Sequence, residues 1–83
     1  MIKVYGKPNC AFCTKAKNLL DQRNLEYEYK DVSLVQNMTE LKEAYPQAKS
    51  VPQIWVGGTH VGGYNQLVSY LEDTGYNGTG HTL

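Results

Sequence analysis

The segment KPNCAFCTKAKNLL (residues 7–20) holds both cysteines of this 83-residue chain, separated by two residues. Before it, the sequence IKVY at residues 2–5 alternates apolar and polar side chains, which predicts a β-strand. Gly6 and Pro8 are expected to end that strand. From position 12 onward the apolar residues fall at helical spacing, so the two cysteines lie where a strand passes into a helix.

The first helix is predicted from one apolar face and its flanking residues. That face consists of Phe12, Ala16, Leu19 and Leu20. Asn9 is the expected N-cap, because an asparagine side chain can accept hydrogen bonds from the first free N–H groups. The helix is expected to end near Asn24.

The centre of the chain repeats this alternation of strand and helix. Residues 26–32, EYEYKDV, alternate tyrosine with polar residues and predict a second strand. Asn37 followed by Glu40 matches a capping box, so a second helix is expected there, and Pro46 is expected to end it. Its apolar face consists of Met38, Leu41 and Tyr45.

The last third of the chain predicts a hairpin and a third helix. PQIWV at residues 52–56 is a third strand, and the Gly57–Gly58 pair predicts a tight turn into a fourth at residues 59–61. The third helix has an apolar face of Tyr64, Leu67, Val68 and Leu71, and Gly75 is its expected C-cap.

The predicted order is therefore β-α-β-α-β-β-α, an α/β fold. The β-α-β unit requires a parallel strand pair and the hairpin an antiparallel one, which predicts a mixed four-stranded sheet with three helices. We expect one domain over residues 1–75 and a flexible C-terminal tail over residues 76–83.

Composition excludes several classes of protein. The formal net charge is zero, so bulk charge indicates no nucleic-acid or membrane partner. No apolar run approaches the roughly 20 residues that cross a bilayer, and no signal-peptide pattern is visible, which favours a cytoplasmic protein. The first 20 residues contain four lysines and no acidic residue, so the cysteines lie in positive surroundings.

The spacing of the cysteines predicts redox chemistry. On a helix, positions three apart lie on nearly the same face, so the sulfurs of Cys10 and Cys13 can bond. Cys10 lies at the helix N-terminus, where free N–H groups, the helix dipole and Lys7 favour a thiolate with a lowered pKa. We expect Cys10 to attack a disulfide and the more buried Cys13 to resolve the mixed disulfide.

Other interpretations of the cysteines explain less. Two merely structural cysteines would account for neither the spacing nor the position after a strand. A CxxC pair is also half of many zinc sites, but the remaining candidates, His60 and His81, are 21 residues apart. We expect His60 to be an exposed strand residue and His81 a tail residue, and we expect no metal site.

The segments KPNCAFC, SVPQIWVGG and GGYNQL, in this order, resemble the glutaredoxins of the thioredoxin superfamily over roughly residues 2–73. The resemblance implies a thioredoxin-like fold and a glutathione site. In the family pattern Cys10 is the nucleophile and Cys13 the resolving cysteine. The residues implied to bind glutathione are Lys7, Phe12, Ser50, Val51, Pro52, Gly63, Tyr64, Asn65 and Gln66.

The resemblance also assigns parts of glutathione to these residues. Lys7 is implied to bind the glycine carboxylate, and a cis proline at position 52 to turn the Val51 backbone toward the glutathione cysteine. Backbone N–H groups of Asn65 and Gln66 can hold the glutamyl carboxylate at a helix N-terminus. Acidic residues are common in the family at these two positions, so weak glutathione affinity is expected.

The implied function is that of a monomeric, glutathione-dependent thiol–disulfide oxidoreductase. It would reduce protein disulfides and glutathione mixed disulfides, with glutathione as co-substrate, no tightly bound cofactor, and clients such as ribonucleotide reductase. One alternative is a thioredoxin-like electron donor reduced by a reductase. Another is a dimer that binds a glutathione-ligated [2Fe–2S] cluster, since position 11 is alanine where proline is commonest.

Overall fold

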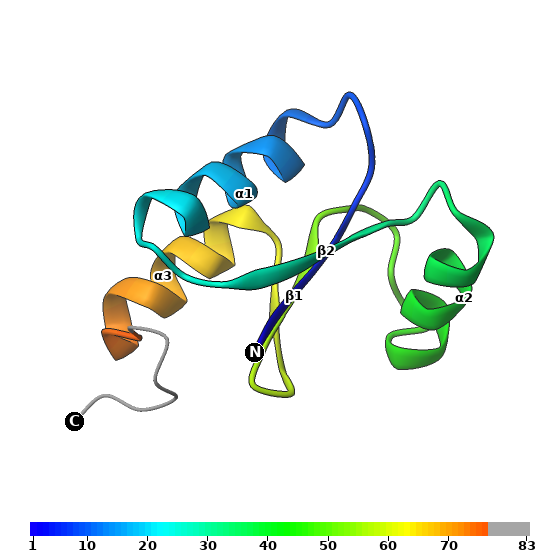
Figure 1. The fold of residues 1–83 in the computed structure, drawn as a ribbon. Coiled ribbons are helices and arrows are strands. Elements are labelled where there is room, and N and C mark those ends of the chain that lie inside the picture. The colour runs from blue at the N-terminus through cyan, green and yellow to red at the C-terminus, as the bar shows by residue number, and fades with distance from the viewer. Residues whose placement is uncertain (77–83) are drawn as a thin grey trace.

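A computed structural model describes residues 1–76 of the chain, and its element order is the predicted one (Figure 1). The strands are β1 (Ile2–Gly6), β2 (Tyr27–Asp31), β3 (Gln53–Val56) and β4 (Thr59–Gly62). The helices are α1 (Ala11–Gln22), α2 (Val35–Ala44) and α3 (Tyr64–Thr74). Each predicted element is therefore present, with bounds shifted by a few residues.

The strands form one mixed sheet in the order β2-β1-β3-β4. β1 pairs with β2 in parallel, with Val4 opposite Tyr29, and with β3 in antiparallel, with Val4 opposite Ile54. β3 and β4 form the antiparallel hairpin that the two glycines predicted. His60 lies opposite Trp55 in this hairpin, and a register shift between Trp55 and Ile54 then pairs Ile54 with Gly62.

Helices cover both faces of the sheet: α1 and α3 lie on one face and α2 on the other (Figure 1). Side chains along a strand point alternately to the two faces, so each central strand serves both layers. The cluster under α1 and α3 contains Ile2, Val4, Ala16, Leu20, Leu25, Ile54, Val56, Leu67 and Leu71. The cluster under α2 contains Tyr5, Val32, Leu41 and Ala48.

The predicted caps of α1 and α2 are wrong. Asn9 has a left-handed backbone (φ 57°), and the N-cap of α1 is Cys10, whose sulfur accepts the Cys13 N–H. Helix α2 starts before the predicted box, at Val35, and its N-cap Leu34 makes no side-chain capping bond.

A turn before α2 explains why the predicted capping box does not form. The Asp31 carboxylate accepts the Ser33 N–H (2.9 Å) and hydroxyl (2.6 Å), and Asn37 Nδ2 donates to the Asp31 carbonyl (3.0 Å). Glu40 instead pairs with Lys30 across to β2 (3.0 Å). Local side-chain bonds of this kind compete with the regular cap.

Helix α3 ends at the predicted cap, because Gly75 takes the left-handed conformation (φ 64°). Tyr76, the last described residue, is half-buried and packs 6.5 Å from the Tyr70 ring, centroid to centroid. The rest of the predicted tail, with His81, lies outside the described residues, so the domain boundary and the tail stay predictions. Over residues 1–76, no helix combines the length and the apolar character needed to cross a membrane.

Candidate active site

The two cysteines lie at the amino end of α1, directly after the β1–α1 loop. Their Cα atoms are 5.2 Å apart and a disulfide joins them. Cys10 is half-buried, whereas Cys13, in the first turn of α1, is fully buried. This inequality agrees with the predicted division between an accessible and a buried sulfur.

Two contacts define the surroundings of Cys10. The Cys13 N–H, one of the first N–H groups of α1 without an acceptor in the helix, donates to Cys10 Sγ at 3.2 Å. A donor at this place stabilises a negatively charged sulfur in the reduced protein. Cys10 Sγ also lies 3.8 Å from the Val51 carbonyl oxygen, which brings the segment before β3 against the dithiol.

The buried side of the dithiol is closed by β1 and β2. A Cβ atom on Gly6 would lie 3.0 Å from Cys13 Sγ and 2.8 Å from Cζ of Tyr29, so only glycine fits without rearrangement. The Tyr29 hydroxyl donates to the Lys7 carbonyl (3.3 Å) and holds the β1–α1 loop. Burial, and secondarily the charge of Asp31, raise the pKa of Tyr29, which keeps it a neutral donor.

A first hollow, of about 170 Å³, opens beside the dithiol. We call it the aromatic hollow; it is lined by Phe12, Ser50, Val51, Pro52, Gly63, Tyr64, Asn65 and Gln66. The Phe12 and Tyr64 rings lie 6.1 Å apart. Lys15 Nζ lies 5.2 Å from the Phe12 ring centroid and 5.9 Å from that of Tyr64, so it adds positive charge to this wall.

Backbone groups form the rest of the aromatic hollow. The Val51–Pro52 peptide is cis, as the resemblance implied. At the start of α3, the Gly63 N–H donates to the Gln66 side chain (3.0 Å), and Gly63 is the N-cap. The first turn of α3 lines the hollow with Asn65 and Gln66, and the first N–H groups of a helix have no acceptor within the helix.

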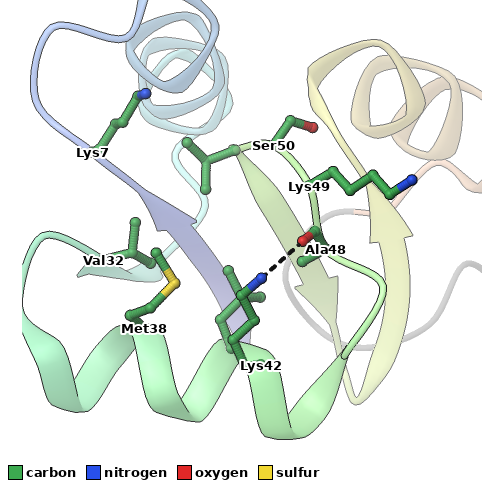
Figure 2. Close-up of a pocket in the computed structure, with 9 residues that line it drawn as sticks. Lys7, Val32, Met38, Lys42, Ala48, Lys49 and Ser50 are labelled. Atoms are coloured by element: carbon green, nitrogen blue, oxygen red, sulfur yellow. Dashed lines mark hydrogen bonds between the residues drawn. The ribbon is translucent and has the colours of Figure 1, made fainter.

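A second hollow, of about 220 Å³, lies on the α2 side of Ser50 and Val51 (Figure 2). We call it the lysine hollow; it is lined by Lys7, Val32, Met38, Leu41, Lys42, Ala48, Lys49, Ser50 and Val51. Lys42 Nζ donates to the Ala48 carbonyl (3.2 Å), the dashed line in Figure 2.

The structure therefore divides the predicted glutathione-binding residues between two hollows. Eight of the nine line the aromatic hollow, and Lys7 lines the lysine hollow instead. Ser50 and Val51 belong to both hollows. The sequence analysis did not predict that Lys42 and Lys49 line a hollow beside the dithiol. The only sequence feature that could have indicated it is the position of Lys49 next to Ser50.

His60 is not the exposed strand residue that was predicted. It is half-buried, with its ring 4.4 Å from that of Tyr45 and 4.5 Å from that of Trp55, centroid to centroid. Its Nε2 lies 2.8 Å from Gln53 Oε1. Among residues 1–76, no three histidine, cysteine or acidic side chains gather in a way that could hold a metal ion.

A CxxC dithiol at the amino end of α1, over a mixed four-stranded sheet, defines the class of thioredoxin-like thiol–disulfide oxidoreductases. Solved structures agree. A buckwheat glutaredoxin–glutathione complex has a TM-score of 0.72 at 25% identity, over 87% of this chain and 68% of that one. A point mutant of the thioredoxin-like protein BC3987 has a TM-score of 0.75 at 29% identity, over 86% of this chain and 90% of that one.

The sequence comparisons identify the family. The glutaredoxin family model matches residues 2–61. Glutaredoxin 1 of Rickettsia typhi is 40% identical over 77 residues, 87% of this chain and 71% of that protein. Hybrid peroxiredoxin hyPrx5 of Haemophilus influenzae is 37% identical over 71 residues, but this chain spans only 29% of its length. The chain belongs to the glutaredoxin family.

Proposed function

We propose that this protein reduces disulfides with electrons from glutathione. The observation that carries the proposal is that Val51 contacts both the dithiol and the hollow. Its carbonyl oxygen lies 3.8 Å from Cys10 Sγ, and the residue also lines the aromatic hollow. A tripeptide in that hollow would present its thiol to Cys10. The similar buckwheat glutaredoxin, solved with glutathione, supports this choice of ligand.

Each lining residue then has a distinct proposed role. The Val51 backbone pairs with the cysteine of glutathione, and Ser50 and Pro52 hold that backbone in place. Phe12 and Tyr64 form the walls of the hollow, while Gly63 leaves room for the ligand. The first-turn N–H groups of α3, at Asn65 and Gln66, bind the glutamyl carboxylate. Lys7, which lines the lysine hollow, attracts the glycine carboxylate.

The chemistry is a balanced series of thiol–disulfide exchanges. The Cys10 thiolate attacks the glutathione sulfur of a mixed disulfide and releases the other partner as a thiolate. A second glutathione thiolate attacks the bound glutathione sulfur, which yields glutathione disulfide and restores Cys10. For a protein disulfide, the Cys10 thiolate first attacks one client sulfur, which forms a Cys10–client mixed disulfide and releases the other client sulfur as a thiolate. The Cys13 thiolate then attacks the Cys10 sulfur, which frees the reduced client and forms the Cys10–Cys13 disulfide. Two glutathione molecules reduce that disulfide and leave as glutathione disulfide.

Turnover of a small glutathione mixed disulfide, with glutathione and glutathione reductase supplying electrons, tests the proposal. Cys10→Ser should abolish turnover, and Cys13→Ser should retain it, because the mixed-disulfide route needs Cys10 alone. An inactive wild-type protein would refute the proposed electron source. Retained activity in Cys10→Ser would refute the assignment of the nucleophile.

A thioredoxin-like electron donor is the second candidate, favoured by the similarity to BC3987. Turnover that requires a flavin-dependent reductase, and fails with glutathione alone, would select it. In the preferred proposal the protein acts as a monomer in the cytoplasm, where glutathione keeps thiols reduced. Disulfide enzymes such as ribonucleotide reductase are the proposed clients, on the family resemblance.

A further inference from the structure

Gln53 is the one polar side chain buried among residues 1–76, with 8% of its surface exposed. It is the first residue of β3 and directly follows the Ser50–Val51–Pro52 segment. Burying a side-chain amide costs free energy unless hydrogen bonds replace those to water. Gln53 has such replacements on both ends: Nε2 donates to the Ser50 carbonyl (3.0 Å), and Oε1 meets His60 Nε2 (2.8 Å).

These contacts fix the direction of both hydrogen bonds made by the Gln53 side chain. A backbone carbonyl only accepts, so the amide nitrogen of Gln53 must face Ser50 and the amide oxygen must face His60. The Gln53 oxygen also only accepts, which assigns the proton to His60 Nε2. The two hydrogen bonds therefore run in the same direction: His60 donates to Gln53, and Gln53 donates to the Ser50 carbonyl.

The ring of His60 is held in the orientation that its hydrogen bond to Gln53 requires. It packs between Tyr45 and Trp55, with centroid separations of 4.4 and 4.5 Å. Trp55 is itself held edge-on by Tyr5, 5.4 Å away. His60 lies opposite Trp55 in the hairpin, so it is a diagonal neighbour of Gln53 on the same face of the sheet.

We propose that Gln53 and His60 are positioning residues that hold the Ser50–Val51 backbone against the dithiol from the α2 side. Neither side chain lines the aromatic hollow. Their effect passes through the Ser50 carbonyl to Val51, whose own carbonyl lies 3.8 Å from Cys10 Sγ. Released from Gln53, the segment would lose its fixed orientation, and a ligand would have to order it on binding.

The test uses two variants that remove the hydrogen bonds while keeping most of the packing. Gln53→Met retains the length of the side chain, and His60→Phe retains a ring between Tyr45 and Trp55. Each should raise the KM for a glutathione mixed disulfide roughly three- to tenfold, the equivalent of one hydrogen bond, with kcat little changed. Gln22→Met, at the exposed end of α1, is the matched control and should leave KM unchanged.

A double variant and a spectrum separate this role from a general loss of stability. If the two side chains act as one unit, the double variant should raise KM no more than either single variant. A KM increase equal to the product of the single effects, or unchanged KM in both single variants, would overturn the proposal. Nitrogen NMR should show the Nε2–H form of neutral His60 in the wild type, and the Nδ1–H form would also overturn it.

This inference rests on the proposed function only for its kinetic readout. An inactive wild-type protein would refute glutathione dependence, whereas an active one with an unchanged KM in the variants would refute the positioning role. The NMR measurement decides the direction of the hydrogen bonds whichever reaction the protein performs.

Discussion

The two faces of the sheet are built by different means. Nine buried residues form one continuous apolar cluster beneath α1 and α3, and only four form the cluster beneath α2. The α2 face is connected instead by polar contacts, including Lys30 with Glu40 (3.0 Å) and Gln53 with His60 (2.8 Å). Because the dithiol is carried by α1, the larger apolar cluster sets its position, while the α2 face orients the segment opposite it.

Leucine deletions on the two faces should show this difference most strongly. Leu20→Ala opens a cavity in the larger cluster and should lower the free energy of unfolding by about 3–5 kcal/mol. Leu41 lies in the smaller cluster and lines the lysine hollow, so Leu41→Ala should cost only about 2–3 kcal/mol. Urea unfolding measures both, and an equal or larger loss for Leu41→Ala would contradict the comparison.

A smaller effect is expected where β1 meets the dithiol. Gly6→Ala places a methyl group 3.0 Å from Cys13 Sγ and 2.8 Å from Cζ of Tyr29, inside ordinary contact distance. The crowding should reduce stability by about 1–3 kcal/mol, measured by the same urea unfolding. A wild-type stability for Gly6→Ala would show that the packing around Cys13 Sγ has room for a methyl group.

The smallest effect should appear on the α2 face and depend on pH. The Ser33 hydroxyl, and secondarily its N–H, hold the pKa of Asp31 below its ordinary value of 3.8. The contribution to stability is therefore complete above that value and is lost as the pH falls through the lowered pKa. In unfolding experiments at a series of pH values, Asp31→Asn should be less stable than wild type at pH 7, with a gap that narrows in acid. A constant gap would exclude this role.

The two faces also differ in how well the sequence predicted them. The α1–α3 face follows hydrophobic periodicity, so its helices and the buried Leu20, Leu67 and Leu71 could be read directly. The errors concern side-chain hydrogen bonds, two of them on the α2 face: the Asp31–Ser33 turn replaced the expected capping box, and His60 was taken as exposed. One error lies on the α1–α3 face, where Cys10 caps α1 in place of Asn9. Such bonds depend on tertiary neighbours, and the sequence pattern carries little information about them.

The candidate site shows the same division. The spacing of Cys10 and Cys13 and their place after a strand predicted the dithiol, because local geometry determines both. The separation of Lys7 from the aromatic hollow could not be predicted, since it depends on how α2 and the Ser50–Val51 segment pack in space. The position of Lys42 in the lysine hollow has the same origin.

The fold makes the two sulfurs unequal, because Cys10 is half-buried at the N-terminus of α1 and Cys13 is fully buried. The most direct test treats the reduced protein with limiting iodoacetamide at neutral pH and locates the modified cysteine by mass spectrometry. We expect modification of Cys10, with Cys13 protected until the protein unfolds. Modification of Cys13 at a comparable rate in the folded protein would contradict it.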